Sequence, residues 1–418
     1  MESMKFAVAA VLAVLAIVSL PAQFGDSFVA SRDVPEISYS NAPVANRVSE
    51  LNDRIRDGRI QLKFDDRSGY LRSVLDALQV PVESQIATFA KNSFQAELIE
   101  RRNPRAVYFS DDVAVGWVRG ADLLEIAAHD PKQGGVFYTL DQKPARSPEL
   151  KREDGCLACH LSWDTLGVPG FFFMSTLAVP DDPHKYASGF SSDDRKNFDT
   201  RWGGWYVTGD IGSLVHMGNV PVSNTDKPAR ADARALKSLD SEFDTAGFPA
   251  HTSDVVALMV LDHQAHMMNL ITRTGWEARL AQNGDPKQLA RVDDAAIDLV
   301  DYMLFVYEAP LTSHVRGSSG FAESFAARGP ADGQGRSLRQ LDLNRRLLKF
   351  PCSYMIYSTA FDAMPPLAKS AVYKRLWRVL SGAERGEPYS QIAAADRLAI
   401  LEILKATKKD LPEYFKGA

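Results

Sequence analysis

Two of the chain's three cysteines lie close together, and a histidine directly follows the second one, in the pentapeptide Cys156-Leu157-Ala158-Cys159-His160. Residues three positions apart face the same side of a helical turn. The fold must therefore present two thiol groups on one turn, with an imidazole beside them. This requirement limits the local structure more than any other feature of the sequence.

Three kinds of site use such residues: a covalently bound haem, a redox-active dithiol and a zinc site. A thioredoxin-like dithiol belongs in a βαβ unit, whereas this pentapeptide follows a charged linker and precedes a loop rich in Gly and Pro. A zinc site would need a fourth ligand, and Cys352 lies far along the chain in an apolar segment, where a buried thiol is expected. The pattern favours one haem c, attached through thioether bonds at Cys156 and Cys159, with His160 bound to the iron.

The N-terminal segment is typical of an export signal. Lys5 precedes an uninterrupted apolar run of 15 residues, Phe6 to Leu20, and Pro21-Ala22 follows near the expected cleavage site. The run is short for a membrane span, which needs about 20 residues. We therefore expect a periplasmic or other extracytoplasmic protein, whose leader is either removed or retained as an anchor in the cytoplasmic membrane.

Charge and composition exclude one class of partner. The chain has a net charge of −5, with 24% charged and 45% apolar residues, and its charges form no basic face. Proteins that bind nucleic acids need such a face to neutralise phosphates. We expect no nucleic-acid partner.

The sequence divides into five parts. Residues 1–25 form the signal peptide or anchor, and the polar residues 26–47 form a tether. Residues 48–145 form a mixed α/β region, and residues 146–225 contain the haem attachment and its loop. Residues 226–418 form a helical C-terminal region.

Apolar spacing predicts the secondary structure within these parts. In the N-terminal region it predicts helices at 71–78 and 83–101, a hairpin at 107–118 and a strand at 134–142. The C-terminal region has helical spacing after Ser253, over 286–307, up to Gly382 and over 396–406. We expect a mainly α fold with a small β-rich N-terminal element, and a haem loop region embedded in a larger, mostly helical protein.

The pentapeptide resembles the attachment site of c-type cytochromes. A wider resemblance, to long exported bacterial proteins that contain a cytochrome c domain and one haem, rests on two segments. These are "RWGGWYVTG…HMGN", from Arg201 to Asn219, and "LRQLDLNRRLLKFPCSYMIYS", from Leu338 to Ser358. The resemblance implies haem and export, but it implies no particular reaction.

The second axial ligand of the iron has several candidates. Met217 and His216 lie in the Gly-containing sequence "VHMGN", downstream of the attachment site as in small c-type cytochromes. His263 and His266, three residues apart on a predicted helix, are the alternatives, although such residues more often form hydrogen bonds at helix interfaces.

Other residues are suited to support the haem. Arg201, Trp202 and Trp205 are of the types that contact haem propionates, although the same residues also serve as aromatic packing. The loop "GVPG" resembles the loop that follows the motif in small c-type cytochromes, so we expect the Pro169 carbonyl to accept a hydrogen bond from His160.

The sequence leaves two functions open. An exported monohaem cytochrome would transfer electrons to and from a redox partner protein. A haem enzyme of peroxidase or oxygenase type would instead need an open iron position and a distal acid or base, such as His216, His263 or His266 assisted by Arg201. The large part of the chain outside the haem region argues against a simple carrier, and a sensor or interaction protein is a third class.

Overall fold

The computed structural model describes residues 31–177, 189–220 and 236–415. The expected leader lies outside the described residues. Within them, no helix has both the length and the apolar character needed to cross a membrane.

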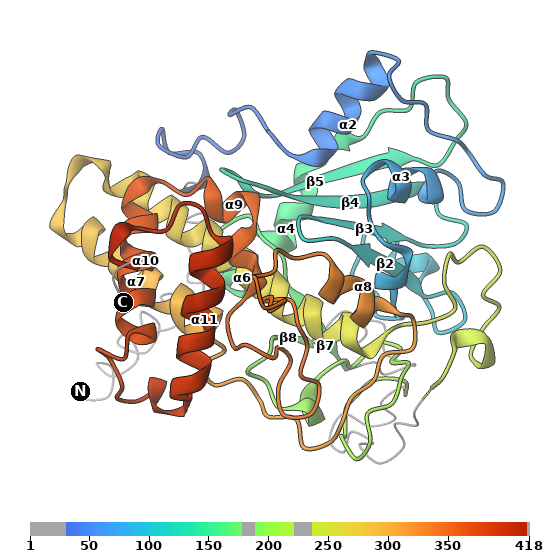
Figure 1. The fold of residues 1–418 in the computed structure, drawn as a ribbon. Coiled ribbons are helices and arrows are strands. Elements are labelled where there is room, and N and C mark those ends of the chain that lie inside the picture. Colours follow the sequence, from blue (N-terminus) through green and yellow to red (C-terminus); the bar gives the residue numbers. More distant parts are fainter. Residues whose placement is uncertain (1–30, 178–188, 221–235, 416–418) are drawn as a thin grey trace, which may run out of the picture.

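A six-stranded antiparallel sheet dominates the N-terminal half (Figure 1). Its strands follow one another in chain order, so the sheet is a simple meander. The strands are β1 (Ile86–Thr88), β2 (Arg105–Phe109), β3 (Val113–Trp117), β4 (Leu123–Asp130), β5 (Gly134–Asp141) and β6 (Lys151–Arg152). A separate two-stranded hairpin joins β7 (Phe173–Thr176) to β8 (Gly189–Ser192).

The expectation of a mainly α fold with a small β-rich element is wrong. The structure is 38% helix and 14% strand, and its sheet spans residues 86–152, so the fold is mixed α/β. The hairpin at 107–118 and the strand at 134–142 are confirmed, but the helix expected at 83–101 is not. There, Ile86–Thr88 pairs with β2 between short 3-10 turns, because the sheet supplies the backbone partners for this apolar segment.

The sheet is buried on both faces. Along β2, Ala106 and Tyr108 pack into one apolar core with helices α2 (Arg47–Arg56) and α3 (Leu71–Ala77). Val107 and Phe109 alternate with them and pack into a second core around α6 (Val255–Leu280). The sheet therefore separates the two cores.

The stretch expected to be a tether packs against this sheet. Residues 31–46 lie between the end of the undescribed leader and α2. Within them, Tyr39 is fully buried, and its hydroxyl donates a hydrogen bond to the Gly135 carbonyl at 2.8 Å. From Ile37 onward this stretch belongs to the core with α2 and α3.

The C-terminal half consists of helices packed around α6. Figure 1 shows α6 between the sheet and the last helices. In this half the described residues form α7 (Pro286–Met303), α8 (Phe321–Ala327), α9 (Thr359–Asp362), α10 (Pro366–Leu380) and α11 (Ala394–Thr407), and the short α4 (Leu157–His160) lies earlier in the chain. Helix α6 is buried over nearly all of its circumference, as expected for a helix in the middle of a large core.

Asp254 fixes the start of α6. Its carboxylate accepts the backbone N–H groups of Val256 and Ala257, which caps the helix. It also accepts the N–H groups of Ser318 and Ser319 from a distant loop. Gly317 is needed there, because a Cβ atom at this position would lie 2.6 Å from the Asp254 carboxylate.

Replacing Asp254 should therefore cost more than replacing an ordinary cap. We expect Asp254→Ala to lower the free energy of unfolding by about 3–5 kcal/mol, because it leaves buried N–H groups without acceptors. Asp285→Ala is the matched control: Asp285 is exposed and caps α7 through Lys287 N–H, so the loss should be about 1 kcal/mol. Urea unfolding measures both, and equal losses would contradict this role of Asp254.

Candidate functional site

The pentapeptide forms the short helix α4, preceded by a 3-10 turn at Asp154–Cys156. Leu157 and Leu161 anchor this turn in the core beneath the sheet. Cys156 is half-buried and Cys159 is exposed, and both are free thiols. The burial of Leu157 and Leu161 thus fixes a turn whose thiols lie at or near the surface.

The environment of Cys156 does not suit a redox dithiol. Burial, together with the negative charges of Glu125 and Glu153, raises the pKa of the Cys156 thiol to about 12. A reactive dithiol needs a nucleophilic cysteine whose pKa is lowered. Zinc has no better support, because no group of three or more His, Cys, Asp or Glu residues is placed to hold a metal ion within the described ranges.

His160 is held by two hydrogen bonds with Gly170. Its Nδ1 lies 2.9 Å from the Gly170 carbonyl oxygen, and the Gly170 N–H donates to the His160 carbonyl at 2.9 Å. Because a carbonyl can only accept, Nδ1 carries the proton, and the lone pair of Nε2 is left available. The expected acceptor, Pro169, is one residue away and instead accepts the N–H of Gly135.

Aromatic rings surround the imidazole of His160. The ring centroid of Phe137 lies 4.5 Å from it, and that of Phe172 lies 4.9 Å from it. Burial lowers the pKa of His160 to about 4, which the hydrogen bond to Gly170 opposes. The imidazole is thus neutral at physiological pH, the form that binds metals.

Helix α6 positions the loop that holds His160. The Asn269 side chain accepts the N–H of Phe171 at 2.8 Å and donates to the Phe171 carbonyl at 2.6 Å. A Cβ atom on Gly170 would lie 2.2 Å from the Asn269 side-chain oxygen, so only glycine fits there. The sequence analysis did not foresee Asn269.

Large apolar side chains are exposed around the pentapeptide. Phe94, 55% exposed, packs beside Gly155, and Trp163, 71% exposed, follows His160 by three residues. Phe190, also exposed, lies on β8, whose Ser191 hydroxyl donates to Asp164 next to Trp163. Such a cluster of exposed apolar groups is typical of a binding surface.

Arg105 is the cation whose charge acts on both His160 and Cys156. Its guanidinium forms a 2.7 Å ion pair with Glu125, while its Nε is buried and has no hydrogen-bond partner among the described residues. The sequence analysis missed this residue, because it lies on β2, far from the pentapeptide in sequence.

The residues expected at the haem propionates already have partners inside the protein. Arg201 is 2% exposed and donates to the carbonyls of Asp194 and Lys196. Trp202 donates its indole N–H to Asp262, and Trp205 donates its indole N–H to the Met174 carbonyl.

The four candidates for the second axial ligand differ in what they can offer. His216 Nδ1 accepts the Gly218 N–H, so its Nε2 carries the proton and has no lone pair for a metal. Both nitrogens of His263 are engaged, with Asp194 and Ser353. Met217 is buried, and the ring of His266 packs edge-on against Tyr302.

Met174 is a further thioether that the sequence analysis did not consider. It lies on β7, two residues after Phe172, and alternate residues of an extended chain point to the same side. Phe172, which precedes β7, contacts His160, so Met174 is close in sequence to the surroundings of His160. Met174 is half-buried, and its sulfur lies 3.9 Å from the exposed Asn92 side chain.

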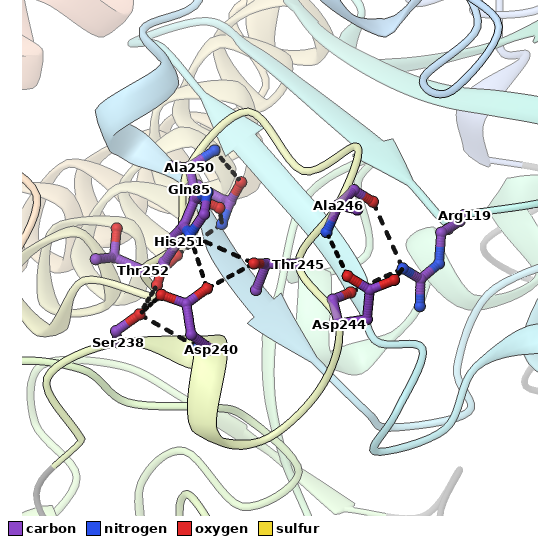
Figure 2. Close-up of polar contacts among 10 residues, drawn as sticks. All are labelled: Gln85, Arg119, Ser238, Asp240, Asp244, Thr245, Ala246, Ala250, His251 and Thr252. Carbon is purple, nitrogen blue, oxygen red and sulfur yellow. Dashed lines mark hydrogen bonds and ion pairs between the residues drawn. The ribbon is translucent and has the colours of Figure 1, made fainter.

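Another polar cluster, shown in Figure 2, braces a surface loop. His251 Nδ1 lies 2.7 Å from the Asp240 carboxylate, and hydrogen bonds from Ser238 and Thr245 lower the pKa of Asp240 to about 2. Gln85 donates to the Ala250 and Thr252 carbonyls at the end of this loop. Asp240 also lines a surface hollow of about 520 Å³, and no residue of the pentapeptide lines this hollow.

Comparisons with known proteins identify no relative. No family model matches the chain. Neither the curated proteins nor the solved structures contain a match. The resemblance to c-type cytochromes therefore rests on the residues described above.

Two buried histidines should make the fold sensitive to acid. Burial lowers the pKa of His129 and of His216 to about 4, whereas an unfolded histidine titrates near 6.5. As the pH falls from about 6.5 to about 4, these histidines bind protons in the unfolded chain but not in the folded chain. The free energy of unfolding should then fall by roughly 3 kcal/mol for each histidine.

Denaturant unfolding at several pH values tests this expectation. His216→Gln should reduce the slope of stability against pH by one proton in this window, because glutamine can still accept the Gly218 N–H but does not titrate. Identical slopes for the variant and the natural protein would contradict it.

Proposed function

We propose that this protein is an extracytoplasmic c-type cytochrome that binds one haem c covalently through Cys156 and Cys159 and transfers electrons. The observation that best supports this proposal is the hydrogen bonding of His160. Its Nδ1–H is committed to the Gly170 carbonyl, which fixes the ring orientation and the tautomer and leaves Nε2 free to bind iron. Histidine ligands of metals are commonly held by such a second hydrogen bond.

The residues around the pentapeptide fit a haem. The two thiols lie on one turn, where both would form thioether bonds with the vinyl groups of one porphyrin. The exposed rings of Phe94, Trp163 and Phe190 offer apolar surface for the macrocycle. Arg105, with an unpartnered Nε, would serve as the cation for a propionate.

We assign the second axial position to Met174. Its thioether lies two residues after Phe172, which contacts His160, and it is half-buried rather than enclosed in the core. A methionine ligand raises the reduction potential of a haem and suits electron transfer. The exposed surface around Cys159 would give a redox partner protein access to the haem edge.

The alternative, a haem enzyme of peroxidase or oxygenase type, needs an open iron position and a distal acid or base. Two of the groups suited to that role are engaged in the interior. His263 is hydrogen-bonded to Asp194 and Ser353. Arg201 donates to the Lys196 carbonyl. These contacts favour electron transfer over catalysis.

Covalent attachment is tested by replacing the cysteines. After co-expression with a cytochrome maturation system, the natural chain should gain the mass of one haem and keep it on denaturation. The double variant Cys156→Ala/Cys159→Ala should lose this covalent haem, whereas Cys352→Ala, which removes the buried third thiol, should retain it. A natural chain without haem would refute the proposed function.

The absorption spectrum tests the axial ligand. The haem-loaded natural protein should be low-spin, and Met174→Ala should become high-spin because the iron loses its sixth ligand. Met217→Ala, the buried control, should stay low-spin. A natural protein that is high-spin and responds to peroxide or azide would favour the enzyme, and a low-spin Met174→Ala would exclude Met174.

A further inference from the structure

An indole and a carboxylate share a buried hydrogen bond that the proposed haem site does not use. Trp202, 1% exposed, donates its Nε1–H to Oδ2 of Asp262 at 3.1 Å. Asp262 lies on α6 and is fully buried. A buried indole N–H needs an acceptor, but a neutral carbonyl suffices, as Trp205 shows with Met174. A carboxylate here is more than the indole N–H requires.

The backbone at Trp202 is strained to make this contact. Its φ angle is +66°, in the left-handed region that bulky residues rarely adopt. Such a conformation is unfavourable and is kept where the surroundings enforce it, often at functional sites. The next residue, Gly203, is fixed against β7, where a Cβ atom would lie 2.3 Å from the Thr176 carbonyl.

The charges around Asp262 suit it to accept a proton. Burial raises the pKa of its carboxyl to about 7, against the effect of the Arg201 guanidinium, which lies 3.8 Å away. Arg201 stays charged and also acts on Asp194, whose pKa is lowered. Arg201 therefore keeps a negative partner when Asp262 is protonated.

We propose that Trp202 and Asp262 form a redox site that releases one electron and moves one proton. A one-electron oxidant, such as an oxidised metal centre, removes an electron from the indole. The Nε1–H bond then breaks, and its proton passes along the existing hydrogen bond to Oδ2 of Asp262. The products are a neutral indolyl radical and a neutral carboxylic acid, so charge and atoms balance. Re-reduction by one electron returns the proton to Nε1.

Contacts connect this site with the pentapeptide. Phe172 contacts His160, and its neighbour Phe173 stacks on Trp205 at 4.3 Å. The backbone N–H of Trp205 donates to the Trp202 carbonyl at 3.0 Å. An oxidising equivalent generated near His160 would reach Trp202 along these groups. The redox chemistry of the pair itself does not depend on haem.

The test generates the radical without haem chemistry. The full chain is illuminated with a ruthenium(III)-forming photo-oxidant, and the radical is followed by transient absorption and by electron paramagnetic resonance of samples with isotope-labelled tryptophan. All samples carry Trp163→Phe, because that indole is 71% exposed and would react first. We expect a neutral tryptophanyl radical that lacks N–H coupling and forms more slowly in D₂O.

Three variants separate the roles of the residues. Trp202→Phe should abolish the neutral radical. Asp262→Asn should leave a radical cation and slow deprotonation roughly 100-fold, because the general base is lost. Trp205→Phe, the matched control, should keep the signal, since the Met174 carbonyl cannot take a proton. Circular dichroism checks that each variant folds.

Two results would overturn the proposal. A neutral radical that persists in Trp202→Phe would place the site elsewhere. In the chain with Trp202 and Asp262 intact, a neutral radical that forms equally fast in D₂O and in H₂O would exclude proton transfer within the pair. This result would count even if Asp262→Asn failed to fold. Failure of haem attachment leaves this measurement intact, so the two proposals fail separately.

Discussion

Polar side chains on a buried helix determine how the rest of the chain is arranged. Helix α6 runs through the core, and a buried polar group there must find a hydrogen-bond partner or lose several kcal/mol. Several of these groups bind other segments. Asp262 bonds to Trp202, His263 to Asp194 and Ser353, Gln264 to Ser110 and Tyr354, and Asn269 to Phe171, while the N-cap Asp254 binds the loop at Ser318. The helix thus specifies the positions of loops that have little regular structure of their own.

The dependence on tertiary contacts separates the elements that the sequence predicts from those that it does not predict. Helices α3, α6, α7, α10 and α11 have apolar residues at helical spacing, and α6 and α7 also begin at a capping aspartate, so the sequence alone predicts them. Strand β4 carries an alternating pattern as well, with Leu124, Ile126 and Ala128 buried, and a search for period-two spacing would find it. Strand β1 has three residues and exists because β2 lies beside it, so no local signal distinguishes it from a helix.

The candidate site shows the same division. Cys156, Cys159 and His160 are recognised as candidates from their spacing, because the attachment proposed for them would need neighbours in sequence. Asn269, Arg105 and Met174 come from other elements and act through tertiary contacts, which spacing does not encode. His216 and Met217 were expected as ligands because of their residue type and their place in a Gly-containing loop downstream of the pentapeptide. Their hydrogen bonds show that they also have a structural task.

That task concerns the two halves of the segment from Arg201 to Asn219. The Met217 N–H donates to the Arg201 carbonyl, and the Asn219 N–H donates to the Trp205 carbonyl. The two halves of this segment therefore bind each other through backbone hydrogen bonds. Gly203 lets the backbone approach β7, while Trp202 reaches α6 and Trp205 reaches Phe173. One segment thus contacts both the hairpin that follows His160 and the buried carboxylate of Asp262.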